Sequence, residues 1–117
     1  MERDPASVLD IVIACRKLSN MVAGRTEDEL ESNEMLRFAV LHLIVMIGEA
    51  TYRLSDEFRD AHSDIPWGDI MGIRNRVIHG YDQIKVPIVW VVATEKSALL
   101  MERLEPLLPP RPPEASP

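Results

Sequence analysis

The sequence contains 117 residues, of which 46% are hydrophobic and 27% are charged, and its formal net charge is −6. This composition is typical of one folded domain with a single core. The acidic balance argues against a broad surface that coats nucleic acid, so any RNA contact would be local or made in a cleft built from more than one chain. The single cysteine, Cys15, excludes an internal disulfide bond, and the N-terminus is unlike a signal peptide. Because the longest apolar run, residues 38–48, is too short to span a bilayer, we expect a cytoplasmic protein with no membrane segment.

The first half of the chain predicts two amphipathic helices. Asp4, followed by a proline, predicts a capped helix start, and apolar residues then recur at helical spacing as far as Gly24. Thr26 and Glu29 form a capping box that predicts the start of a second helix, over residues 28–54. Because this second helix is apolar on several faces in its middle, we expect it to be central to the core or to a subunit interface.

The second half of the chain predicts two further helices. Residues 58–66 contain turn-forming residues and predict a loop, and a helix over residues 67–79 follows and is stopped by a glycine. The last helix is expected from near residue 87 to about residue 108, and the proline-rich residues 109–117 are expected to be a disordered tail. The predicted fold is therefore all-α, with residues 1–108 forming one bundle of four main helices with short connections.

The third predicted helix ends in a cluster of chemically capable side chains. Arg74 offers a planar fork of donors that suits phosphate, and His79 can move a proton near neutral pH. Asn75 and His79 lie one turn apart on the same face, whereas Arg74 and His79 lie about 140° apart around an ideal helix. They converge only if the chain leaves the helix at Gly80 or if a second subunit contributes. The spacing alone favours the simpler alternative, an exposed helix end whose cations interact with the helix dipole.

A glycine and a glutamate stand out in the most apolar helix. Gly48 costs about 1 kcal/mol relative to alanine inside a helix, which predicts the close approach of another backbone. Glu49 has two interpretations of equal weight. It pairs with Arg53 one turn later on its own helix, or it orients Arg74 or His79 from the neighbouring helix.

The other two histidines carry no sign of a site. His42 lies on the apolar helix and is expected to be a hydrogen-bonded core residue, whereas His62 lies in the polar loop and is expected to be solvated. No residues have metal-ligand spacing, and no glycine-rich phosphate loop occurs. The sequence therefore predicts no metal and no cofactor.

With these residues identified, the chain resembles the HepT-like toxins of the HEPN superfamily, which are small helical ribonucleases of prokaryotic toxin–antitoxin systems. The resemblance covers about residues 5–105 and is carried by segments that are specific in their combined order and spacing. These segments are Ile47-Gly48-Glu49-Ala50, Ile65-Pro66-Trp67, residues 72–81 and Val89-Trp90.

The resemblance implies a homodimer in which two copies of an Arg-x4-His-x-Tyr motif line a shared cleft. It also implies metal-independent RNA cleavage by attack of a ribose 2′-hydroxyl, which leaves a cyclic phosphate. Arg74 would then stabilise the charge of the transition state, and His79 would act as general base or acid. Asn75 would be the polar neighbour of the arginine, and Arg76 would add positive charge to the cleft.

The resemblance gives Tyr81 the role of a modification site. In type VII-like toxin–antitoxin pairs of this kind, a minimal nucleotidyltransferase antitoxin transfers AMP to the motif tyrosine. AMP on Tyr81 would block RNA by its bulk and negative charge. The chain departs from many relatives by carrying Lys85 near a position that is acidic in those proteins. This difference affects the expected contact with the antitoxin more than the expected fold.

Two other classes of function are compatible with the sequence. In the first, the bundle is a non-catalytic partner of a nucleotidyltransferase, and Arg74 only holds a nucleotide phosphate or an acidic partner. In the second, the bundle is purely structural, and substitution of Arg74 or His79 changes neither activity nor partner binding. Cleavage of RNA in the presence of EDTA separates these alternatives from a ribonuclease.

Overall fold

The computed structural model describes residues 3–108, which are almost entirely helical and contain no strand. The all-α fold predicted from the sequence is therefore confirmed, whereas the predicted tail, residues 109–117, lies outside the described residues. The helices are α1 (Asp4–Val22), α2 (Glu27–Ser32), α3 (Glu34–Arg53), α4 (Asp56–Ala61), α5 (Trp67–Gly80), α6 (Val86–Val91) and α7 (Ser97–Leu104).

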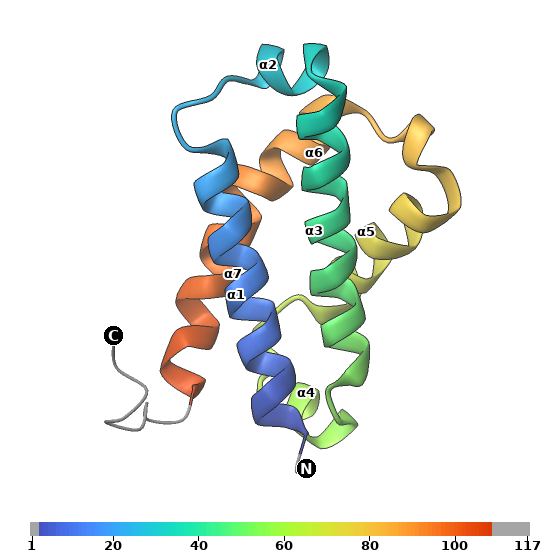
Figure 1. The fold of residues 1–117 in the computed structure, drawn as a ribbon. Coiled ribbons are helices and arrows are strands. Elements are labelled where there is room, and N and C mark those ends of the chain that lie inside the picture. The colour runs from blue at the N-terminus through green and yellow to red at the C-terminus, as the bar shows by residue number, and fades with distance from the viewer. Residues whose placement is uncertain (1–2, 109–117) are drawn as a thin grey trace.

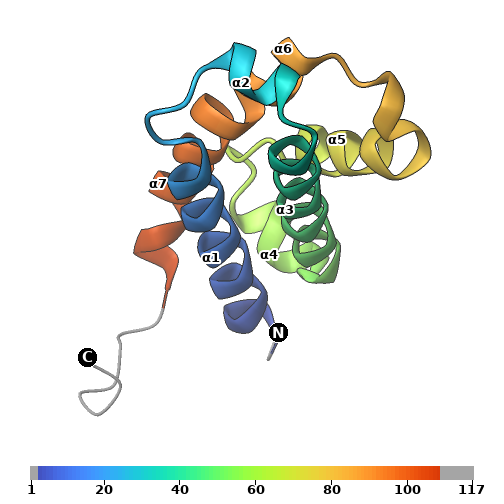
Figure 2. The same cartoon turned by 45° about the horizontal axis from the view of Figure 1, so that its top comes forward.

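α3 is the central helix of the bundle. It packs against α1 and against α5, and α7 packs against α1 (Figures 1 and 2). The core between these helices includes fully buried side chains such as Ile11 and Leu18 of α1, Val40 of α3 and Leu104 of α7. The short helices α2 and α4 flank the two ends of α3 in sequence, so the main helices are the four that the sequence predicts.

By length and composition, α3 as a whole could cross a membrane. Its longest apolar run, residues 38–48, is too short to do so. Half of its most apolar 18-residue window is buried inside the bundle (50%). The packing of this helix against α1 and α5 accounts for that composition, because a central helix of a helical domain is apolar on several faces.

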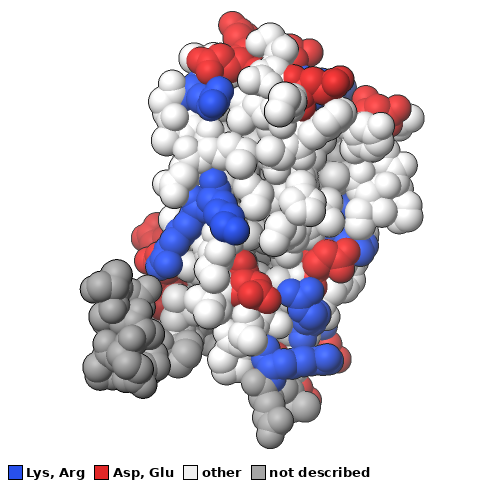
Figure 3. All heavy atoms as spheres, viewed as in Figure 1, with Lys and Arg blue, Asp and Glu red and all other residues white. Residues whose placement is uncertain are grey.

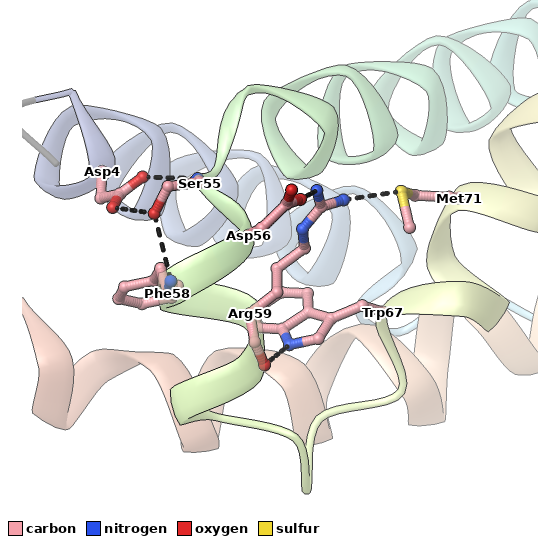
Figure 4. A network of polar contacts seen from close by, with 7 residues as sticks. All are labelled: Asp4, Ser55, Asp56, Phe58, Arg59, Trp67 and Met71. Carbon is pink, nitrogen blue, oxygen red and sulfur yellow. Dashed lines mark hydrogen bonds and ion pairs between the residues drawn. The ribbon is translucent and has the colours of Figure 1, made fainter.

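The start of the first helix differs from the prediction, because Asp4 does not cap it. The capping position is Arg3, which makes no side-chain cap hydrogen bond. Asp4 is buried, and its carboxylate accepts hydrogen bonds from the backbone N–H (2.8 Å) and the hydroxyl (2.7 Å) of Ser55 (Figure 4). Burial, the largest single effect, would raise the pKa of Asp4, but the hydrogen bonds from Ser55 act in the opposite direction and help to lower the pKa below its ordinary 3.8.

The predicted helix over residues 28–54 is wrong in one respect, because the chain breaks it at Asn33. Thr26 caps the start of α2 as predicted, with its side chain accepting from the N–H of Glu29. Asn33 then adopts an extended conformation and its side chain accepts from the N–H of Leu36 at 3.0 Å. An asparagine at this position therefore ends α2 and starts α3.

The predicted loop over residues 58–66 is also partly wrong, because α4 occupies its first half. Ser55 caps α4 by accepting from the N–H of Phe58. The indole of Trp67 is buried, and it donates to the backbone oxygens of Arg59 and His62 (Figure 4). His62 is half-buried with its ring 4.5 Å from that of Phe58, so it is less solvated than predicted.

The last predicted helix is confirmed as one helical run, but its pitch changes along the way. α6 begins at Val86, and a π-helical segment, Val92–Lys96, joins it to α7. The hydroxyls of Thr94 and Ser97 each donate to the carbonyl four residues earlier, at 2.7 Å. Such side-chain bonds compete with the backbone ladder and accompany irregular helical turns.

Candidate functional site

The absence of a side chain at Gly48 places α5 directly against α3. A Cβ atom added at Gly48 would overlap with Cβ and Cγ of Arg74, and these atoms belong to the fixed base of the side chain. The predicted close approach at Gly48 is confirmed, but the group that approaches is the side-chain stem of Arg74 and not a backbone as predicted. The contact fixes where the Arg74 side chain, which is carried by α5, lies against α3.

Arg74 is held by side chains from both helices. Its Nε donates to Oε1 of Glu49 at 3.2 Å, its Nη2 donates to the same oxygen, and its Nη1 donates to Oδ1 of Asn75 at 2.8 Å. The Arg74 side chain is 21% exposed and that of Glu49 is 43% exposed. Of the two interpretations of Glu49, the structure supports the contact with Arg74, because Arg53 pairs instead with Asp10 at 3.3 Å.

Tyr52 also belongs to this cluster, although it is not among the site residues predicted from the sequence. The Arg74 guanidinium lies 5.1 Å from the centre of the Tyr52 ring. The Tyr52 hydroxyl accepts from Nδ2 of Asn75 at 3.0 Å and lies 3.3 Å from Oδ1 of the same amide. The available sequence signal was its position one turn after Gly48 and three residues after Glu49, on the helix face that meets α5.

His79 and Tyr81 lie further along the same chain segment and are open to solvent. His79 is exposed in the last turn of α5, and within residues 3–108 it makes no hydrogen bond, ion pair or ring contact. Tyr81 begins a 3-10 turn (Tyr81–Gln83), is 56% exposed and packs edge-on against Phe38. One chain therefore brings Arg74, Glu49 and Asn75 together but does not link Arg74 to His79.

The other cations of this region are also exposed. Arg76 points to solvent from α5. Lys85 is the capping residue of α6, and no side chain caps that helix. A lysine ammonium has no acceptor, so it cannot cap a helix start as an acidic side chain would.

The apolar cavity of the bundle lies apart from the Arg74 cluster. An apolar cavity of about 200 Å³ lies between α3, α5 and α7 and is lined by residues such as Ile44, Ile73 and Leu100. None of the predicted site residues lines it. An open groove of about 670 Å³ runs beside Tyr81 and Lys85, with acidic as well as basic side chains along it.

The chemistry of the remaining groups adds no second site. Among the described residues, no group of three or more His, Cys, Asp or Glu side chains could hold a metal ion. Burial raises the pKa of the Cys15 thiol to about 12, so this thiol is protonated and unreactive near neutral pH.

Comparison with known proteins agrees with the resemblance seen in the sequence. The profile of a family described as "Ribonuclease HepT-like" matches residues 11–107. A protein of Methanocaldococcus jannaschii named "Putative RNase" is 27% identical over 86% of this chain and 92% of its own length. A "Putative RNase" of Caldanaerobacter subterraneus subsp. tengcongensis is 30% identical over 84% of this chain and 88% of its own length. A "Probable ribonuclease HepT" of Thermococcus cleftensis is 31% identical over 84% and 89%, respectively. No solved structure matches the chain significantly.

Proposed function

The chain belongs to the HepT-like ribonuclease family and has an all-α bundle of the HEPN type. On this premise, we propose that the protein is a metal-independent endoribonuclease toxin of a type VII-like toxin–antitoxin pair. Its substrate is RNA, as the family implies. We further propose that Arg74 and His79 carry the chemistry and that Tyr81 is the site at which a nucleotidyltransferase antitoxin attaches AMP. The cytoplasm is the proposed location.

The observation that carries the proposal is the state of the Arg74 guanidinium. It has five N–H donors, and three of them are used by Glu49 and Asn75. Two N–H donors on the terminal nitrogens therefore remain for the oxygens of a phosphate. An arginine that is anchored on one side and open on the other is suited to stabilise a pentacoordinate phosphate without losing much side-chain entropy.

A second copy of the chain supplies what one copy lacks. Arg74 and His79 lie on different sides of α5, and His79 has no partner among the described residues. We therefore propose a dimer in which the motifs of two copies face one cleft. The two Arg74 and two Arg76 side chains would then create a local positive field that RNA can enter despite the net charge of −6.

The surface of α3 offers a face for this dimer. A row of exposed or half-buried residues recurs every three or four positions along it, and we name this row the α3 stripe. His42 belongs to the row and is exposed, so its prediction as a core residue is wrong. The members of the α3 stripe are Met35, Phe38, His42, Val45, Met46, Glu49 and Tyr52.

The charges of the surface agree with a dimer along α3. Figure 3 shows that the surface over the upper part of α3 is largely uncharged, whereas acidic side chains gather above it. Acidic residues of the first turn of α2 include Glu27, Asp28 and Glu29. An uncharged strip with a charged border is typical of a surface that pairs with another protein.

The proposed cleavage needs only proton transfers and charge stabilisation. One imidazole removes the proton of the ribose 2′-hydroxyl, the 2′-oxygen attacks phosphorus, and the bond from phosphorus to the 5′-oxygen breaks. A second imidazolium gives its proton to the 5′-oxygen, and a cyclic phosphate remains. In the proposed dimer, His79 and the copy of His79 in the other subunit take these two roles.

Tyr81 is exposed enough to be modified by an enzyme. The residue is 56% exposed and its 3-10 turn follows directly on α5, two residues after His79. AMP on its phenol would carry bulk and a negative charge to the side of the proposed cleft. RNA would then be excluded by sterics and by repulsion.

The proposal is tested by RNA cleavage in EDTA with unmodified wild-type protein and with a His79→Ala variant. We expect the wild type to cleave and the variant to lose about 10²–10⁴-fold in rate, because general acid–base catalysis contributes that much. Circular dichroism and sedimentation check that the variant is folded and associates like the wild type.

Each other outcome of this experiment has a distinct meaning. Equal cleavage by both proteins would show a contaminating nuclease or a misassigned residue. If neither folded protein cleaved, the non-catalytic partner of a nucleotidyltransferase would become the better interpretation. That alternative draws on the pairing of Arg74 with Glu49, which already neutralises the guanidinium in the free chain.

A further inference from the structure

Two hydrogen bonds to one oxygen do not by themselves fix the plane of the Arg74 guanidinium. Nε and Nη2 both donate to Oε1 of Glu49, so the group can still pivot about that single acceptor. A bidentate pair with two acceptor oxygens would prevent the pivot. The remaining constraints on the guanidinium come from Asn75 and Tyr52.

Tyr52 acts on Arg74 in two ways. Its ring lies 5.1 Å from the guanidinium carbon, which restricts the pivot by occupying one side and attracts the cation. Its hydroxyl accepts from Nδ2 of Asn75 at 3.0 Å. This shorter of its two contacts with the amide is compatible with the orientation in which Oδ1, and not the NH2 group, faces Nη1 of Arg74 at 2.8 Å.

We propose that Tyr52 is a positioning residue that orients the guanidinium of Arg74 toward the RNA phosphate, through its ring directly and through its hydroxyl by way of Asn75. This inference rests on the proposed function, in which Arg74 stabilises the transition state. A planar fork stabilises a phosphate only when its free N–H groups point at the oxygens, so its orientation affects the rate of the chemical step more than substrate binding.

Tyr52 is suited to substitution because it is not part of the core. The residue is 45% exposed, and the hydrophobic core of the bundle does not include it. Because Tyr52 belongs to the α3 stripe, each variant is checked for dimer formation by sedimentation before its activity is interpreted.

The first test compares Tyr52→Phe, which keeps the ring, with Tyr52→Leu, which removes both ring and hydroxyl. With RNA in EDTA, we expect kcat to fall about threefold in Tyr52→Phe and about tenfold in Tyr52→Leu, with little change in KM. In an Arg74→Lys background, Tyr52→Leu should have almost no further effect, because an ammonium group has no plane to orient. Equal losses in both backgrounds would overturn the proposal.

The second test needs no activity, so it separates a failure of this inference from a failure of the proposed function. In NMR spectra of ¹⁵N-labelled protein, the Nε–H signal of Arg74, assigned by its loss in Arg74→Lys, should be displaced by the ring current of Tyr52. The displacement should persist in Tyr52→Phe and disappear in Tyr52→Leu. If Tyr52→Leu leaves the signal unchanged, Tyr52 does not orient Arg74, whether or not the wild type cleaves RNA.

Discussion

At the scale of single residues, the site depends on a side chain that is missing. Gly48 has no Cβ, and the space is filled by Cβ and Cγ of Arg74. Neither Gly68 nor Gly72 of α5 has a neighbour within 4 Å of an added Cβ, so neither is needed for packing. Gly48 is therefore different in kind from Gly68 and Gly72.

Substitution of Gly48 by alanine should destabilise the protein although alanine favours helix. The helical preference gains about 1 kcal/mol, but the forced separation of α3 and α5 should lower the free energy of unfolding by about 1–3 kcal/mol in total. Urea denaturation measures this difference. Cleavage activity should fall with it because Arg74 is displaced.

Gly72→Ala is the matched control for that experiment. It places the same methyl group in the middle of α5 with no neighbour to meet, so it should raise the free energy of unfolding by up to about 1 kcal/mol. If Gly48→Ala stabilised the protein as much as Gly72→Ala, the close approach of α3 and α5 would be contradicted.

At the scale of elements, polar side chains at the helix ends decide where each helix begins and how the ends are joined. Thr26, Asn33 and Ser55 each accept a hydrogen bond from the N–H three residues later. Asp4 then joins two helices, because it accepts both the N–H and the hydroxyl of Ser55. The start of α1 and the start of α4 are therefore stabilised together (Figure 4).

Asp4→Asn should weaken this junction in a pH-dependent way. At pH 7 we expect a loss of about 1–2 kcal/mol in the free energy of unfolding, because charged hydrogen bonds to Ser55 are replaced by weaker ones. The folded-state pKa of Asp4 is lowered, so its contribution is complete above the ordinary pKa of 3.8 and is lost as the pH falls through the folded-state value. Denaturation at pH 7 and pH 3 measures both effects.

The comparison variant is Asp10→Asn, which breaks an exposed pair with Arg53. Exposed pairs contribute about 0–1 kcal/mol, so this variant should change little at pH 7. The wild type and Asp4→Asn could also differ in free energy of unfolding by the same amount at pH 7 and at pH 3. That result would show that the charge of Asp4 does not stabilise the junction.

At the scale of the whole molecule, the bundle is thin and its central helix reaches the surface. The Cα atoms extend over 41 × 33 × 19 Å. α3 is buried where it meets α1 and α5, yet Met46 and Phe38 in the α3 stripe remain exposed. This arrangement leaves an apolar surface that a second copy can cover.

Met46→Glu should weaken the proposed dimer. A carboxylate in the α3 stripe would lie against its own copy or against an apolar neighbour across the interface. We therefore expect the dissociation constant of the dimer to rise at least about tenfold. Sedimentation equilibrium measures the change, and RNA cleavage should decline in parallel because the cleft needs two motifs.

Leu99→Glu is the control, since Leu99 is similarly exposed but lies on α7, outside the α3 stripe. It should leave association unchanged. If both variants associated like the wild type, the α3 stripe would not be the dimer surface, and another face would have to bring the two motifs together.

The sequence by itself determined the class of fold, most helix starts and ends, and the residues of the motif. The capping box at Thr26, the turn at Gly24 and the end of α5 at Gly80 are signals that act within one helical turn, so they can be read locally. The break at Asn33 was equally local, but the helix-favouring glutamates on both sides of it, Glu31 and Glu34, concealed the cap.

Only the tertiary structure decided which side chains meet across helices. Glu49 binds Arg74, 25 residues away, and Asp4 binds Ser55, 51 residues away, although each had a plausible partner or role on its own helix. Tyr52 joins the site for the same reason. Local signals specify how a helix is made and where it ends, whereas the partner of a side chain depends on the crossing point of two helices, here set by the space at Gly48.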